Sequence, residues 1–383
     1  MGSVRNLSGA VRGLAGIGGC LALAAVTACA GAVPGAAAGS AVTSHAKKTS
    51  SPRRAVPTTT APRVRGGTLP AGNPAGGATV PVAGQEVVTS HPDHVIGNDT
   101  PASCTSAAVV AAVAAGGVIT FSCGPDPVTI TMTATATVAN TSHRVVLDGG
   151  GKVTLSGGGT TQILSMNAGW ERQWPQLVVQ NLTFTDAYSG TEQTKGTLVY
   201  GGGAIFDEGG QLKVVNSAFV GDACRPSGPD LGGGAIRAVG MYPASTVYIT
   251  DDTFQQDSCS NGGALSGLFA DFDVINSLLT DNKAIGRGAN PAAGTSGGGS
   301  GGAIYTDGAR YNLSITGTVM HGNTALEGGG GIFFVVDSGG GTLQITSSTL
   351  DDNPSGQFQN APGIFDSVNG RDTQPVVVSS SIE

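Results

Sequence analysis

A run of small and aliphatic residues returns five times along the chain, and this repetition constrains the fold more than any other feature. The run reads GGGAIF at 201–206, GGGAIR at 232–237, GGAL at 262–265, GGAIY at 301–305 and GGGIFF at 329–334. An apolar anchor also closes a strand-like segment in each repeat, at Phe184, Phe219, Phe254, Leu279, Met320 and Leu350, in steps of 35, 35, 25, 41 and 30 residues. Periods of about 20–50 residues indicate a solenoid of stacked repeats.

Within each repeat the pattern is that of short β-strands. The segments QLKVVNSAF (211–219) and TLQITSSTL (342–350) alternate between apolar and polar residues, as half-buried strands do. Glycines between the segments supply turns, and the 63 glycines follow no Gly-X-Y period, which argues against collagen. The sequence therefore predicts an all-β domain over residues 91–383, in which each repeat is one coil of a parallel β-helix.

Stacking of the coils predicts ladders of equivalent residues about 4.8 Å apart. An inward aliphatic ladder is expected from Ile205, Ile236, Leu265, Ile304 and Ile332. A polar ladder is expected three residues after successive anchors, at Asp222, Asp257, Asn282, Asn323 and Asn353. No single coil can bury its own inner face, so the repeats stabilise one another.

A short helix is predicted immediately before the repeats, over residues 106–115. Thr105 or Ser106 is suited to cap its start and Gly116 to end it. We expect this helix to cover the N-terminal edge of the stack, because an open sheet edge invites aggregation.

The N-terminus reads as a lipoprotein signal peptide at 1–28, with a short apolar segment that ends in Val26-Thr27-Ala28-Cys29. This motif resembles the lipobox of bacterial lipoproteins, which implies lipidation of Cys29 and a membrane anchor. The alternative is an ordinary signal peptide cleaved further on, which would leave a secreted protein. Residues 29–90 are rich in Ala, Pro, Ser and Thr and predict a disordered, basic linker.

An exported chain meets an oxidising compartment, so the four cysteines beyond Cys20 and Cys29 are expected to form two disulfides. Three pairings are possible. Cys224 and Cys259 each lie five residues after an anchor, in successive coils, and this register pairs them. Cys104 and Cys123 then pair by exclusion.

The Gly-Gly-Ala-Ile run with its Phe-x-x-Asn companion resembles the repeat of the polymorphic outer-membrane proteins and of the right-handed β-helix superfamily, which includes pectate and pectin lyases. The resemblance covers roughly residues 100–370. It implies a single-stranded, right-handed parallel β-helix. It is specific for the fold and carries little information on function.

One exposed face is the candidate for binding. The residue after each inward aliphatic residue should point outward, which gives a ladder of Phe206, Arg237, Ser266, Tyr305 and Phe333. Stacked aromatic rings and an arginine can hold sugar rings, so we predict ligand binding through Phe206, Arg237, Tyr305 and Phe333. The alternative is that these side chains pack beneath the long loops. Trp170 and Trp174 lie in a loop and offer either a sugar platform or a contact with the helix.

The competing hypothesis is a polysaccharide lyase or glycoside hydrolase acting on an acidic polysaccharide. It would use Arg237 as the base, with Asp207 and Glu208 holding Ca²⁺. A second acidic group, at Asp251, Asp252, Asp257, Asp271 and Asp273, fits a ladder of turn residues better than a calcium site. Without the lyase activity we expect no metal and no cofactor.

These observations favour a monomeric, envelope-anchored surface protein that binds carbohydrate or matrix, or acts as an adhesin, without catalysis. A purely structural envelope spacer is a further alternative. Residues 91–383 carry 11 Lys and Arg against 25 Asp and Glu, a net charge of −14, which argues against nucleic acid as a partner.

Overall fold

The computed structural model describes residues 70–383 apart from residues 171, 191–199, 230, 241–244 and 289–296. The predicted signal peptide, the lipidation site at Cys29 and the predicted linker up to residue 69 lie outside the described residues. Among the residues that are described, no helix is both long and apolar enough to cross a membrane.

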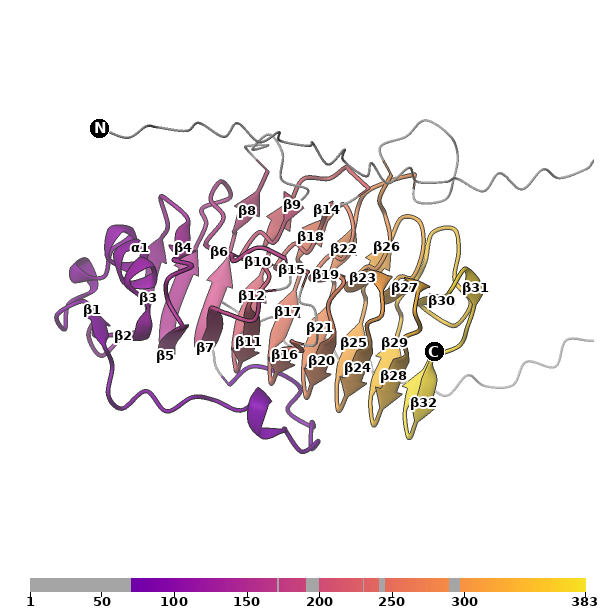
Figure 1. The fold of residues 1–383 in the computed structure, drawn as a ribbon, viewed down its shortest axis with the longest axis horizontal. Helices are drawn as coiled ribbons and strands as arrows, with labels where there is room; N and C mark the ends of the chain where they lie inside the picture. Colours follow the sequence, from indigo (N-terminus) through magenta and orange to yellow (C-terminus); the bar gives the residue numbers. More distant parts are fainter. Residues whose placement is uncertain (1–69, 171, 191–199, 230, 241–244, 289–296) are drawn as a thin grey trace, which may run out of the picture. The chain divides into compact units, whose positions relative to one another are not determined.

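The described residues form an all-β structure in which successive repeats add strands to the same parallel sheets (Figure 1). The 17-stranded sheet, here the large sheet, contains β1 (His94–Ile96), β2 (Gly117–Phe121), β3 (Val128–Thr131), β5 (Arg144–Ser156), β7 (Gln176–Thr185), β11 (Gln211–Val215), β12 (Ala218–Val220), β16 (Val247–Thr250), β17 (Thr253–Gln255), β20 (Phe272–Ile275), β21 (Leu278–Thr280), β24 (Leu313–Thr316), β25 (Val319–His321), β28 (Leu343–Thr346), β29 (Thr349–Asp351), β32 (Val376–Val378) and β33 (Ser381–Ile382).

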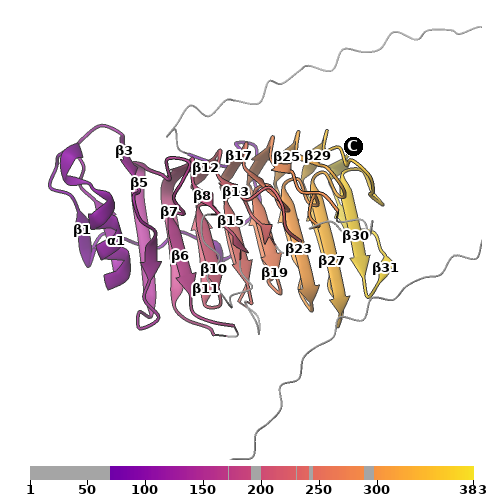
Figure 2. The ribbon, with the colours of Figure 1, turned by 90° about the horizontal axis from the view of Figure 1, so that it is seen from above.

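A nine-stranded sheet contains the strands that follow the glycine runs, and Figure 2 shows most of them side by side. Its members are β4 (Ala136–Val138), β6 (Leu164–Asn167), β10 (Ile205–Glu208), β15 (Ile236–Val239), β19 (Leu265–Leu268), β23 (Ile304–Ala309), β27 (Ile332–Ser338), β30 (Ile364–Val368) and β31 (Arg371–Asp372). Only β31 pairs antiparallel among these strands, with β30.

Two smaller parallel sheets complete the repeats. The five-stranded sheet contains β8 (Tyr188–Ser189), β13 (Ala223–Cys224), β18 (Ser258–Cys259), β22 (Lys283–Ala284) and β26 (Thr324–Ala325). The two-stranded sheet pairs β9 (Tyr200–Gly201) with β14 (Leu231–Gly232).

The strand register follows the repeats that the sequence defines. The anchors pair in order, for example Phe219 with Phe184 and with Phe254. The three phenyl rings stack with centroids 4.8 Å apart and nearly parallel planes. The predicted aliphatic ladder is likewise in register and fully buried, and Leu164 and Ile364 extend it. Like residues therefore stack on like residues through the core.

The predicted polar ladders connect one repeat to the next. The turns between successive strands of the large sheet hold residues with positive φ, and Asn216 (46°), Asp251 (56°) and Asn276 (49°) are examples. Asn and Asp tolerate this region better than other side chains. The residue after the turn bonds across the repeat, since the backbone N–H of Ser217 donates to Oδ1 of Asp252 at 2.7 Å.

The N-terminal helix forms where the sequence predicts it, as α1 (Ser106–Ala115). The Thr105 side chain accepts a hydrogen bond from the Ala108 N–H, and Gly116 ends the helix with a φ of 82°. Val109 and Val113 are buried against the core cluster, so α1 lies over the β1–β5 end of the stack (Figures 1 and 2). The disulfide between Cys104 and Cys123, with Cα atoms 5.8 Å apart, fixes this end.

The structure differs from the sequence-based prediction for residues 70–90. They are not part of a disordered linker, because they run along the large sheet and make specific hydrogen bonds to it, including Asn73 N–H to the Asn276 carbonyl at 2.7 Å (Figure 1, indigo). The segment includes a short 3₁₀ helix, η1 (Val82–Gly84), and η2 (Pro101–Ser103) follows before α1. Side chains of the sheet bind the backbone of residues 70–90, so their docking requires no periodic apolar pattern in the sequence.

Candidate ligand-binding face

The predicted outward ladder exists in register on the nine-stranded sheet. Phe206 pairs with Arg237, Arg237 with Ser266, Ser266 with Tyr305, and Tyr305 with Phe333. Phe365 of β30 continues the ladder beyond Phe333.

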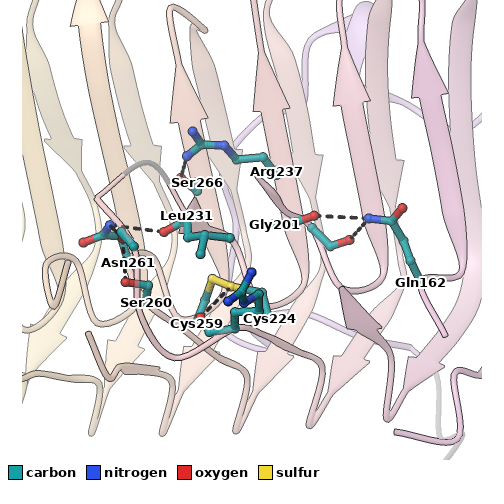
Figure 3. Close-up of a disulfide and its surroundings, with 12 residues drawn as sticks. Gln162, Gly201, Cys224, Leu231, Arg237, Cys259, Ser260, Asn261 and Ser266 are labelled. Atoms are coloured by element: carbon teal, nitrogen blue, oxygen red, sulfur yellow. Dashed lines mark hydrogen bonds between the residues drawn. A yellow bond between two sulfur atoms is a disulfide. The ribbon is translucent and has the colours of Figure 1, made fainter. Parts of the chain in front are cut away.

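The first half of this ladder is covered, and the expectation that it is exposed is wrong. Phe206 is 8% exposed, Arg237 is 1% exposed and Ser266 is fully buried. Arg237 lies along the backbone of Gly232, where an added Cβ atom would come within 2.8 Å of Nη1. Its Nη1 also donates a hydrogen bond to Ser266 Oγ (Figure 3). Arg237 is therefore packed under the chain.

A disulfide holds the chain that crosses beside this covered half. Cys224 and Cys259 are bonded, with Cα atoms 4.7 Å apart, which is the pairing that the repeat register predicts. Leu231 packs with both cysteines in a small buried cluster (Figure 3). Leu231 is therefore buried against the disulfide.

The second half of the ladder is partly exposed and aromatic. The rings of Tyr305 and Phe333 stack with centroids 5.0 Å apart and planes 7° apart, and Phe333 and Phe365 stack at 5.3 Å. Phe358 meets the edge of this stack, 4.9 Å from the Phe365 ring. We call Tyr305, Phe333, Phe358 and Phe365 the aromatic stack. All four residues are partly exposed, although burial raises the pKa of the Tyr305 hydroxyl well above its ordinary value.

Polar groups flank the aromatic stack at the Tyr305 end. The Tyr305 hydroxyl donates a hydrogen bond to Asp307 Oδ2 at 3.0 Å. Burial, and then the charge of Asp337, raise the pKa of Asp307 above its ordinary value, although the bonds from Tyr305 and the Gly308 N–H act in the opposite direction. Asp337 itself is exposed. The arrangement offers apolar ring faces beside groups that can bond to hydroxyls.

A second aromatic pair lies beside the ends of β6, β15 and β19 of the nine-stranded sheet. Trp170 meets Phe269 edge to face with ring centroids 5.3 Å apart, and it packs on Gly240, at which a Cβ atom would lie 2.8 Å from the indole ring. Trp170 is 41% exposed, and Trp174 is exposed as well. The indole of Trp170 is therefore placed on the nine-stranded sheet rather than on α1.

The residues proposed for lyase chemistry are not brought together. Asp207 pairs with Ala238 and Met166, which are core residues, so its carboxyl group points into the core, while Arg237 points outward. Neither Asp207 oxygen has a hydrogen-bond partner among the described residues. Burial first, and then the charge of Glu208, raise the pKa of Asp207 well above its ordinary value. A neutral, inward carboxyl group does not fit a calcium ligand.

Glu208 and the acidic group that includes Asp252 and Asp271 also lie in structural positions, where they are buried or accept hydrogen bonds. Glu208 is buried, and burial raises its pKa. Asp252 accepts hydrogen bonds from the backbone N–H groups of Ser217 and Thr250, and Asp271 accepts one from Asn312. Within the part of the chain that the structure describes, no three His, Cys, Asp or Glu side chains are grouped so that they could hold a metal ion.

Sequence reasoning missed Phe358, Phe365 and the pair of Trp170 with Phe269. Phe365 follows a degenerate form of the repeat, in which Ala361-Pro362-Gly363-Ile364 replaces Gly-Gly-Ala-Ile, and that form was the available signal. No comparable signal joins Trp170 to Phe269. Comparisons of the chain with family models, with curated proteins and with solved structures find no match.

Proposed function

We propose that this chain is a right-handed parallel β-helix, similar to the pectate-lyase-like superfamily, that binds carbohydrate without catalysing its cleavage. The parallel sheets, the in-register ladders and the repeat motif support this description of the fold. The two disulfides are compatible with an extracytoplasmic location, and the lipobox supports anchoring through Cys29.

The observation that carries the binding proposal is the partly exposed stack of Tyr305, Phe333 and Phe365. The C–H faces of a sugar ring pack well on an aromatic face, and neighbouring carboxylates accept hydrogen bonds from its hydroxyls. Exposed apolar surface rimmed by polar groups commonly marks a binding site. Asp307 and Asp337 supply such groups at the Tyr305 end.

Charge indicates which glycans this face accepts. Asp337 is exposed beside the stack, and the domain as a whole is acidic, whereas Arg237 is buried and cannot receive a uronate there. Neutral glycans, or glycans that carry amino groups, therefore suit the face better than polyuronates.

A panel of immobilised polysaccharides tests the proposal. The purified protein should be retained by at least one neutral or amino polysaccharide, and Tyr305→Ala with Phe333→Ala should abolish that retention. In a parallel assay, the protein is incubated with a set of soluble polyuronates and Ca²⁺, and the absorbance of unsaturated product is monitored. Product formed by the wild type and lost in Arg237→Ala would establish the lyase alternative. Blank results in both assays would leave the envelope spacer.

A further inference from the structure

Residues 71–89, here the docked segment, lie against a row of polar side chains that successive repeats contribute to the large sheet. The row consists of Asp148, Gln180, Lys213, Asn216, Thr253 and Asn276. We propose that this polar row is an acceptor for an extended polypeptide, and that the same segment from a second copy of the chain can replace the docked segment.

Two amide side chains of the row bind the backbone of the docked segment in the same way. Gln180 accepts from the Val87 N–H at 2.9 Å and donates to the Val87 carbonyl at 3.0 Å. Asn276 accepts from the Ala78 N–H at 2.9 Å and donates to the Ala78 carbonyl at 3.0 Å. Each amide thus satisfies both polar groups of one residue, as a neighbouring β-strand would. Such contacts recognise an extended backbone.

Other members of the row extend the same recognition along the stack. Lys213 Nζ donates to the Gln85 carbonyl at 2.6 Å, and Asp148 Oδ2 accepts from the Thr89 hydroxyl at 2.6 Å. Because the repeats place these groups at regular intervals, the row has the periodicity of a strand-binding surface.

The glycines of the docked segment give the row its selectivity. Gly72 has a φ of 88°, and a Cβ atom there would lie 2.7 Å from the Asn276 carbonyl oxygen. A Cβ atom at Gly76 would lie 2.8 Å from Cβ of Asn276. A replacement segment must therefore have glycine at both positions. Every copy of this chain carries one segment that meets this condition, which is why we name a second copy as the partner.

The docked segment is held by few apolar contacts and can detach locally. Val82 is 83% exposed and Val88 is 81% exposed. Segments with little apolar burial open at a lower free energy than the core. The strands beneath pair with one another independently of the docked segment, as β11 does with β7 and β16, so the row persists when the segment leaves. Exchange of a segment between two copies is a common route to a symmetric dimer.

The test begins with the full chain carrying a protease site inserted between Ser90 and His91, both of which are exposed. The chain is folded, cut, and titrated with a fluorescent synthetic peptide of residues 69–90, with anisotropy as the readout. The cut chain should bind the peptide at least tenfold more tightly than the uncut chain, because the tethered segment competes at an effective concentration on the order of millimolar. A peptide with Gly72→Ala should bind at least tenfold more weakly.

Matched variants assign the binding to the row. Gln180→Ala and Asn276→Gly should each weaken peptide binding, and glycine at 276 preserves the positive φ of that turn. Gln344→Ala removes an exposed amide from the same sheet outside the row and should leave binding unchanged. A cut chain that releases its fragment and takes up no peptide would overturn the proposal, as would equal binding by all variants.

The second-copy partner is tested on the uncut, full chain by light scattering. A dimer should form as the concentration is raised, and Gly72→Ala with Gly76→Ala, which blocks docking of the segment on any copy, should abolish it. A chain that stays monomeric, or a dimer that persists in this double variant, would overturn the exchange between copies. Since none of these measurements involves glycan, their outcome is independent of the proposed carbohydrate binding.

Discussion

The backbone N–H of Asp222 donates a hydrogen bond to Oδ1 of Asp257 in the next repeat, at 2.8 Å. Asp257 N–H donates to Asn282 Oδ1 at 2.9 Å in the same way, and the ladder continues to Asn353. The two acids differ from the amides in one respect. Asn282 donates from Nδ2 to the Phe254 carbonyl, whereas Oδ2 of Asp222 and of Asp257 has no partner among the described residues.

Both carboxyl groups are fully buried, and burial is the largest cause of their raised pKa values. The bonds that they accept from backbone N–H groups lower the pKa, and the carboxyl groups of Asp186 and Asp222, respectively, raise it further. Burial therefore favours the neutral form of both acids, in a ladder whose other members are amides.

Substitution of Asp257 by Asn should stabilise the protein at neutral pH. The amide keeps the Oδ1 acceptor and adds a donor where Asp257 has an unpartnered oxygen, so we expect a gain of about 1–2 kcal/mol in the free energy of unfolding. Urea denaturation at pH 7 measures it. The reciprocal variant Asn282→Asp should lose a similar amount, and a destabilised Asp257→Asn would refute the ladder interpretation.

Stability should fall as the pH rises above about 4, the pKa of an unfolded aspartate. Below that pH the two carboxyl groups are protonated in both states, and their contribution is fully present. Above it the unfolded state releases protons that the folded state retains, so the free energy of unfolding declines until the raised folded pKa is passed. Denaturation between pH 4 and 8 should show a shallower decline in Asp222→Asn with Asp257→Asn. Parallel curves for the wild type and this double variant would contradict the assignment.

Removal of the Cys224–Cys259 disulfide should destabilise the protein by roughly 3–4 kcal/mol in the chain-entropy model, because the bond closes 35 residues. Calorimetry of Cys224→Ser with Cys259→Ser measures the loss. The control is Cys104→Ser with Cys123→Ser, which removes a disulfide that closes 19 residues. Its loss should lower the free energy of unfolding slightly less. An unchanged melting temperature in the first double variant would show that the disulfide does not stabilise the repeats.

Truncation of Phe219 should strongly destabilise the protein, because its ring is stacked on Phe184 on one side and Phe254 on the other. Phe219→Ala should cost about 3–5 kcal/mol, and Phe219→Leu should cost much less. Chemical denaturation distinguishes the two. Equal, small losses would indicate that the core does not depend on this stack.

Features that arise from periodicity were predictable from the sequence, since stacking places equivalent residues in contact. The anchors from Phe184 to Leu350, the ladder from Ile205 to Ile332, and the Cys224–Cys259 disulfide follow from one register. The Cys104–Cys123 disulfide then follows by exclusion. Helix α1 was predictable from its caps. Here local signals and the fold agree.

Features that depend on aperiodic segments were not predictable. The burial of Phe206 and Arg237 does not follow from alternation, which gives only the direction of a side chain. Arg237, for example, packs along Gly232 of β14. The docking of residues 70–90 depends on backbone hydrogen bonds to Gln180 and Asn276, which leave no apolar pattern in the segment. The composition of that segment, taken alone, predicts a linker.

The most direct test of the carbohydrate-binding proposal is the dissociation constant of the protein for the polysaccharide that retains it, measured by titration calorimetry. Phe333 lies in the partly exposed aromatic stack, whereas Phe206 lies in the same ladder but is buried. We predict that Phe333→Ala weakens binding at least tenfold while Phe206→Ala, where it folds, changes the constant less than twofold. Equal constants for the wild type and Phe333→Ala would contradict binding through the aromatic stack.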